Sequence, residues 1–270
     1  MFEIGTKYKT GVKRFGLINW IGAWTLYKKE VLRFLIVWVQ TIFSPLISSL
    51  LFLLVLSLAI GSDRGEVLGV SFISFLAPGL IAMSIIQQSF SHSSSSFMIG
   101  KIQWNIVDIL YAPLSPGEVI TAVTLAAVTR SVMIASISII IFYFIIDLEI
   151  KNYFTLIAFT FLSSFVLGAL GVIAGLWAEK FDHMATVTNF VIIPLSFLSG
   201  TFYTTDRLPS FLQSISEANP FFYMIDGFRY SFIETSDGSI FVGLIYLSIL
   251  SITMWFIAYF LYKKGYKIKS

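Results

Sequence analysis

Residues 91–117 read SHSSSSFMIGKIQWNIVDILYAPLSPG and separate two strongly apolar runs of the chain. This stretch is the longest hydrophilic link on the side of the apolar runs that carries most of the positive charge. A protein that only sits in lipid can join two membrane spans with a handful of residues, as this chain does elsewhere. A long and partly helical link therefore predicts a contact through which another protein acts on the spans.

The composition is that of an integral membrane protein. Of the 270 residues, 57% are hydrophobic and 12% are charged, and the mean hydropathy is +0.85, which leaves too little polar surface to cover a soluble globule of this size. The absence of cysteine excludes disulfides and thiolate metal sites. The first apolar run begins near Phe34 and is too long for a cleaved signal peptide, so none is expected.

Six apolar runs each supply the roughly 20 residues that a helix needs to cross a ~30 Å hydrocarbon core. Continuous apolarity without alternation favours helices over barrel strands. We therefore predict an all-α membrane protein with a single domain over residues 1–270, made of a tail and interfacial helix (1–33), a six-span bundle (34–262) and a second tail (263–270). The predicted spans are residues 34–60, 70–90, 118–146, 153–178, 184–203 and 240–262.

The positive charge is distributed unequally between the two sides of these spans. Thirteen lysines and arginines fall in the two tails and in the links on their side, against four in the links on the other side. This asymmetry satisfies the positive-inside rule, and an even number of spans returns the C-terminus to the side of the N-terminus. We predict that both termini are cytoplasmic.

Two segments outside the spans are predicted to form helices of their own. Residues 19–33 place apolar side chains near one helical face and basic ones on the other, which is typical of a helix lying along the membrane interface. Residues 204–239, on the outer side, are half apolar and are broken at Asn219-Pro220. The second half of this outer segment carries Asp226 and Arg229, which are spaced to pair on one helical face.

The motifs of common enzymes are missing. The sequence has no GxxxxGK[ST], no HExxH and no GxSxG, and neither of its histidines, His92 and His183, has a carboxylate at metal-ligand spacing. We therefore expect no enzyme activity and no catalytic, cofactor-binding or metal-binding residue in this chain. We expect membrane lipid as a partner and no nucleic acid.

Arg130 and a glycine stripe are the unusual features inside the spans. Arg130 lies about a dozen residues into the third predicted span, hence ~18 Å along it and near the midplane. A buried cation either faces a translocation path or a subunit interface, or forms a structural pair. Gly171 and Gly175 belong to a small-residue stripe that allows close helix approach, within one subunit or between two.

Within the long link, residues 97–110 are predicted to form a short amphipathic helix outside the bilayer. Such a helix, rigidly joined to the next span, can pass a push from a bound protein into that span. Apolar and polar residues interleave along it, and the APLSP sequence ends it. The residues assigned to this coupling contact are Phe97, Lys101, Ile102, Trp104, Ile106 and Asp108.

These segments, in this order, resemble the type-2 ABC exporter permeases of bacteria over nearly the whole chain. The resemblance rests on LYKKEVLRFL, WVQTIFSPLI, GKIQWNIVDILYAPLSP, LSGTFY and LPSFLQSISEANPFFYMIDGFRYSF. It implies a six-span half-transporter of the inner membrane that forms a homodimer, or a heterodimer, and docks a separate cytoplasmic ABC ATPase, which binds ATP and Mg and hydrolyses the ATP. It further implies that residues 97–110 are the coupling helix and residues 19–33 the elbow helix, both in contact with the ATPase, with Lys28, Glu30 and Arg33 as the contact residues of the elbow helix. The outer segment is implied to form re-entrant helices.

The cargo and the class of transporter leave alternatives open. Export of an amphipathic, drug-like or lipidic substrate ranks first, and export of a lipid-linked polysaccharide or lipo-oligosaccharide ranks second. The alternative from another class is an ATP-independent secondary transporter or a membrane scaffold. An ion-coupled carrier usually needs carboxylates in mid-membrane, and the predicted spans carry almost none.

Overall fold

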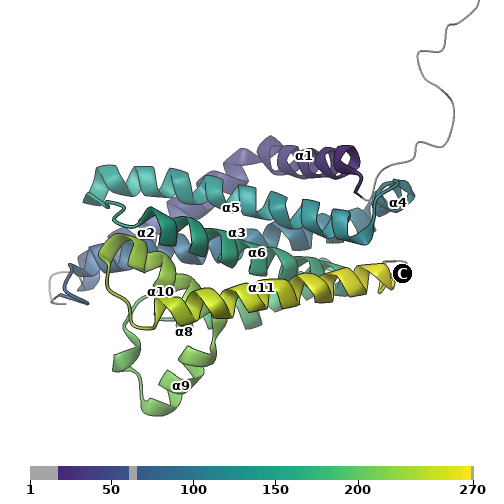
Figure 1. Cartoon of the computed structure of the whole chain (residues 1–270). Coiled ribbons are helices and arrows are strands. Elements are labelled where there is room, and N and C mark those ends of the chain that lie inside the picture. Colours follow the sequence, from purple (N-terminus) through teal and green to yellow (C-terminus); the bar gives the residue numbers. More distant parts are fainter. Residues whose placement is uncertain (1–17, 61–65, 269–270) are drawn as a thin grey trace, which may run out of the picture.

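Helices form all the long regular elements of the computed structural model, which describes residues 18–60 and 66–268 (Figure 1). The predicted tail residues before residue 18, and Lys269 and Ser270, lie outside the described residues. The helices are α1 (Trp20–Ile36), η1 (Val39–Phe43), α2 (Ser44–Ile60), α3 (Phe72–Ile102), α4 (Ile106–Tyr111), α5 (Pro116–Ile146), α6 (Tyr153–Trp177), α7 (Phe181–Val187), η2 (Thr188–Ile192), α8 (Ile193–Leu198), η3 (Thr205–Arg207), α9 (Ser210–Ala218), α10 (Pro220–Ile233) and α11 (Ile240–Lys263).

Six helical segments of the described chain are long and apolar enough to cross a membrane, which confirms the predicted number. Four of them begin and end within a few residues of the prediction, whereas the second and the fifth differ. The segments are Val39–Ala59, Phe72–Ile102, Pro116–Ile146, Tyr153–Trp177, Phe181–Leu198 and Ile240–Lys263.

The second span does not end at residue 90, as predicted, because α3 continues without a break to Ile102. No glycine or proline stands between Gly79 and Gly100, so nothing in this segment interrupts the helix. The hydroxyls of Ser94 and Ser95 bond to carbonyls of the preceding turn, Ser95 to the His92 oxygen at 3.0 Å, whereas the buried Ser93 hydroxyl has no hydrogen-bond partner. The serine run of the quoted stretch is therefore buried helix, and the open part of the link begins only after Ile102.

Two spans contain a π-helical turn shortly before a proline. The turn Val39–Phe43 precedes Pro45, and the turn Thr188–Ile192 precedes Pro194. A proline cannot donate the next helical hydrogen bond, and a wider turn relieves the crowding that its ring causes. The fifth span consequently consists of α7, η2 and α8 and ends at Leu198, five residues before its predicted end.

The glycine stripe brings α6 against α3. A Cβ atom at Gly171 would lie 2.5 Å from the carbonyl oxygen of Phe90, and one at Gly175 would lie 2.8 Å from that of Ser94. Both distances are too short for any side chain, so glycine is required for this approach. The two glycines are enclosed by contacts within the chain, which fits the packing within one subunit that the sequence left open, and a role on a translocation path or at a subunit interface stays a prediction.

The outer segment contains a helix, α10, that packs into the bundle against α3, α6 and α11. Eleven of its fourteen residues are buried. A Cβ at Gly227 would lie 2.1 Å from the ring of Phe159, so this glycine lets α10 reach α6. The preceding helix α9 extends away from the bundle in Figure 1.

Candidate functional site

The connection between α3 and α5 lies at one end of the bundle, together with the start of α1 and the end of α11 (Figure 1). It is not the single helix over residues 97–110 that the sequence predicted, because the chain turns at residues 103–105. Trp104 takes a left-handed backbone conformation with φ of 61°, which ends α3 and starts the six-residue helix α4. The contact surface is therefore a turn followed by a short helix.

The predicted coupling residues of this connection divide into two groups. Phe97 and Ile106 are buried in one apolar cluster with Leu26 of α1 and Val119 of α5, so they hold the connection to the bundle. Trp104 and Asp108 point away from that cluster and are exposed, Trp104 to 72%. Ile102 is 44% exposed, and with Tyr111 and Leu110 it adds to an apolar surface around the turn.

Lys101 is used inside the chain. Its Nζ donates a hydrogen bond to the carbonyl oxygen of Leu176 at 2.8 Å and a second one to that of Ala178, so it caps the C-terminal end of α6. A few residues further, Lys267 of the C-terminal segment pairs with Glu179 at 2.7 Å, which lowers the pKa of Glu179 and raises that of Lys267. The ends of α3, α6 and α11 are thus tied together.

The helix α1 packs along α5 at the same end. Its N-cap residue Asn19 donates its backbone N–H to Glu118 Oε1 at 2.6 Å and its side-chain amide to the Pro113 oxygen at 3.0 Å. Two turns later Tyr27 bonds to Thr129 at 2.7 Å. The contacts progress in the same direction along both helices, so α1 packs parallel to α5 at the side of the bundle.

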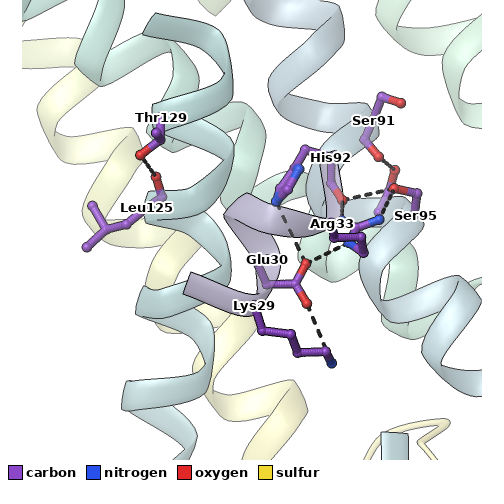
Figure 2. A network of polar contacts seen from close by, with 9 residues as sticks. Lys29, Glu30, Arg33, Ser91, His92, Ser95, Leu125 and Thr129 are labelled. Carbon is purple, nitrogen blue, oxygen red and sulfur yellow. Dashed lines mark hydrogen bonds and ion pairs between the residues drawn. The ribbon is translucent and has the colours of Figure 1, made fainter. Parts of the chain in front are cut away.

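Glu30 and Arg33 of α1 face α3 and form a buried polar cluster with it (Figure 2). Arg33 donates to Glu30 Oε2 at 2.9 Å, to the His92 carbonyl oxygen at 2.9 Å and to the Ser95 hydroxyl at 3.2 Å. Glu30 is only 1% exposed, and the His92 ring lies 3.8 Å from it. Lys28, by contrast, is exposed.

Arg130 of α5 belongs to the same region between the helices. It is 7% exposed and donates a hydrogen bond to Gln88 of α3. The Nε atom of Arg130 and both ring nitrogens of His92 have no hydrogen-bond partner, which is costly for buried polar atoms. This cluster is incompletely satisfied, in contrast to most buried polar groups.

Sequence reasoning missed His92 and Gln88 as members of this cluster. It placed His92 in the hydrophilic link, because the predicted span ended at residue 90. Gln88, His92 and Ser95 fall at i, i+4 and i+7 of α3, which places them on one helical face. The absence of a helix breaker before Gly100 was the available signal.

At the opposite end, Asn219 joins α10 to α8. It caps α10 by accepting the Phe221 backbone N–H at 3.1 Å, and its amide donates to the Leu195 carbonyl at 2.9 Å and to the Ser199 hydroxyl at 2.8 Å. Pro220 follows as the first residue of α10, where its missing N–H costs nothing. The predicted break at this dipeptide is therefore a helix start.

Asp226 and Arg229 do not form the predicted ion pair. Asp226 accepts the backbone N–H groups of Asp237 and Gly238, both at 3.0 Å. Arg229 donates to the Gly200 oxygen at 2.7 Å and lies over the Phe75 ring at 3.9 Å. Burial raises the pKa of Asp226 to about 6, although the nearby Arg229 charge and the two N–H groups act in the opposite direction.

The polar residues of both ends hold helices together, and they do not converge on one open pocket. Within residues 18–60 and 66–268, His, Asp and Glu side chains do not gather in groups of three that could hold a metal ion. What the arrangement can transmit is movement, because the turn at Trp104 is rigidly joined to α1, α3, α5 and α6. The candidate functional site is therefore the surface formed by the turn at residues 103–105 and by α4.

Known proteins are similar in sequence to this chain along most of its length. The ABC-2 type transporter family matches residues 22–233. The inner membrane transport permease YadH of Escherichia coli (strain K12) is 32% identical over 254 residues, which cover 94% of this chain and 99% of that protein. Nodulation protein J of Rhizobium leguminosarum bv. viciae is 28% identical over 221 residues, 79% of this chain and 82% of that protein. The family match extends from α1 to the end of α10.

Proposed function

Because the chain belongs to the ABC-2 type transporter family, as its sequence motifs predicted, we propose that it is the membrane-spanning subunit of an ATP-driven exporter. The chain is a multi-pass protein of the inner membrane. Its partner is a separate cytoplasmic ATPase that binds ATP and Mg, and two copies of the chain, or this chain and a related one, form the translocation path. Both termini and α4 face the cytoplasm.

The observation that carries this proposal is the protruding connection between α3 and α5. Each of these helices has 31 residues and is thus about 46 Å long at 1.5 Å per residue, against a hydrocarbon core of ~30 Å. Their joined ends extend beyond the lipid and present Trp104 and Tyr111, which are 72% and 87% exposed. An exposed aromatic pair on a rigid projection is suited to a groove on another protein.

The proposed coupling residues accordingly have two roles. Ile102, Trp104 and Asp108 contact the ATPase, and their exposure supports this role. Phe97, Lys101 and Ile106 fix the projection to α1, α5 and α6. Glu30 and Arg33 pass the movement from α1 to α3, while Lys28 remains on the open surface. Reversing the charge of Lys101 would break the cap on α6, so it would not report on the partner contact alone.

For the cargo we propose an amphipathic, drug-like or lipidic molecule. The exposed surfaces of α2 and α11 are almost entirely apolar, with Leu58 at 76% and Phe241 at 71% exposure, which suits a path that an apolar cargo can enter from the bilayer. A lipid-linked glycan is the second candidate from the sequence. Ion-coupled transport is disfavoured because the only carboxylates in the six spans, Glu118 and Asp182, lie in the first turn of a helix.

The test replaces Trp104 by alanine and measures how much ATPase is retained when the permease is purified from cells that produce both proteins. Interface tryptophans often contribute 2 kcal/mol or more, so retention should weaken by roughly tenfold or more. Stimulation of ATP hydrolysis by the permease should fall with it. Trp38→Ala is the matched control, because Trp38 directly precedes the first span and is 49% exposed, and this variant should leave retention unchanged. Equal retention by both variants would contradict the assigned surface.

A further inference from the structure

A cavity of about 640 Å³ lies between α1, α5 and α11, within the range of ligand pockets. Trp20, Ala23, Trp24 and Tyr27 of α1 form one wall, and Leu125 of α5 and Trp255 of α11 lie opposite. Trp20 and Trp24 are 72% and 64% exposed, so the cavity is open to the surroundings of the bundle. No predicted site residue lines it.

The polar side chains in the wall are already bonded to other parts of the chain. Glu118 accepts the backbone N–H groups of Asn19 and Ser115 at 2.6 and 2.7 Å. Thr121 accepts the indole N–H of Trp255 at 3.0 Å, and Thr129 bonds to Tyr27. A buried water needs two to four polar partners, which this wall does not offer. The cavity therefore suits a hydrocarbon occupant.

A lysine stands close to this apolar space. Tyr259 of α11 stacks on Trp255 with ring centroids 5.5 Å apart, and the Lys263 ammonium lies 5.7 Å from the centre of the Tyr259 ring. An aromatic column thus leads from the cavity to a cation in the last turn of α11. This sequence of groups matches a molecule with an apolar tail and an anionic head.

We propose that the cavity binds one acyl chain of an anionic phospholipid from the surrounding bilayer, with its phosphate beside Lys263. The bilayer is the source of the occupant because the exposed surfaces of α1 and α11 that border the cavity are apolar and lie in a membrane protein. The lipid fills the space between α1 and the spans and holds α1 against α5. The inference requires the membrane location alone, so it stands apart from the ATP-driven export proposed above.

The first test fills the cavity. Full-length protein is stripped of lipid in detergent, given phosphatidylglycerol or phosphatidylcholine in stated amounts, and examined by native mass spectrometry for bound lipid. Wild-type protein should keep one phosphatidylglycerol per chain. Ala23→Phe should lose it, because the ring occupies the space between α1 and Trp255. Thr25→Phe is the matched control, since it adds the same ring to an exposed position of α1 outside the cavity, and it should bind lipid as the wild type does.

The second test removes the charge. A lysine near a membrane surface contributes about 1 kcal/mol to binding of anionic lipid, so Lys263→Gln should lower the preference for phosphatidylglycerol over phosphatidylcholine about fivefold. Lys264→Gln, one residue further and also exposed, should leave it unchanged. Unaltered lipid binding by Ala23→Phe, or equal effects of the two glutamine variants, would overturn the proposal. So would wild-type protein that binds no lipid, because another protein segment or a second copy would then occupy the cavity. Both readouts are made without ATP or a partner protein, so they do not depend on transport.

Discussion

Two arginines are buried in this bundle, and they are held in different ways. Arg229 of α10 is 1% exposed, donates to the carbonyl oxygens of Gly200 and Thr201 at 2.7 and 3.3 Å, and lies over the Phe75 ring. Arg130 of α5 is 7% exposed and has one side-chain amide, Gln88, as its hydrogen-bond partner. The Nε atom has no hydrogen-bond partner in either arginine. The first guanidinium is held by backbone carbonyl oxygens, and the second by a side chain that can change its rotamer.

The surrounding charges increase the difference. The carboxylate of Asp226 acts favourably on Arg229, and α3 makes room for the guanidinium, since a Cβ at Gly79 would lie 3.0 Å from Arg229 Nη2. Arg130 has the positively charged Arg33 as a neighbour. The carboxylate of Glu30 forms its ion pair with Arg33. A buried cation without a counter-charge is unfavourable. The comparison suggests that Arg229 stabilises the fold and that Arg130 is kept for another reason.

The largest effect is expected from Arg229→Met. Hydrogen bonds to a charged group contribute about 1.5–3 kcal/mol each, and this variant loses two of them, so we expect a loss of about 4 kcal/mol, on the order of 10 °C in the unfolding midpoint. Two carbonyl groups and the Asp226 carboxylate would lose their cation. Thermal unfolding in detergent measures the change in the unfolding midpoint. Arg207→Met, at an exposed position, is the control. A midpoint within 2 °C of wild type would remove the distinction between the two arginines.

The pH dependence of stability sharpens the role of Asp226. Burial raises its pKa from the ordinary 3.8 to about 6 in the folded protein, so the group favours folding below about pH 4, and this contribution is lost as the pH rises through 6. In Asp226→Asn nothing titrates at this position. Between pH 4 and pH 7 the stability of this variant should therefore rise relative to wild type by up to about 3 kcal/mol.

The measurement is the difference between the two unfolding midpoints as a function of pH. Asp237, whose pKa burial also raises, is present in both proteins, so its titration contributes to both curves. Asp147→Asn, at an exposed position, serves as the control and should follow the wild-type curve. A difference that stays constant from pH 4 to pH 7 would mean that Asp226 is charged throughout this range.

The same two regions show what the sequence could predict. The number of spans and most of their ends follow from local hydropathy, and the structure confirms them. The sequence counted Arg229 among the outer residues, because its burial depends on α10 packing against α3 and α6, helices that lie far away in the chain. No local pattern reports such a contact. The glycine at position 227 was a signal, since only its packing against Phe159 explains it.

The prediction was wrong for a different reason at the end of the bundle where α1 meets α3. Serines and a histidine were interpreted as a polar link, although hydroxyls that bond to the preceding turn can remain inside a buried helix, as Ser89 does with the Ile85 carbonyl at 2.7 Å. Polarity was given more weight than the absence of a helix breaker. For the same reason Glu30 and Arg33 were assigned to an open surface, when they meet His92 inside the protein.

The smallest effect on stability is expected from Arg130→Met, although Arg130 is buried almost as deeply as Arg229. The variant loses one hydrogen bond to Gln88 and also loses the cost of a buried cation beside Arg33, so the two changes offset each other to within about 1 kcal/mol. If Arg130 serves transport, with its unpaired Nε available to an anionic group, then ATP-driven transport should fall at unchanged expression. The pair of measurements separates the two roles, because a purely structural residue would lower the unfolding midpoint and transport together. Normal transport at a normal midpoint would show that the incomplete hydrogen bonding of this cluster serves neither purpose.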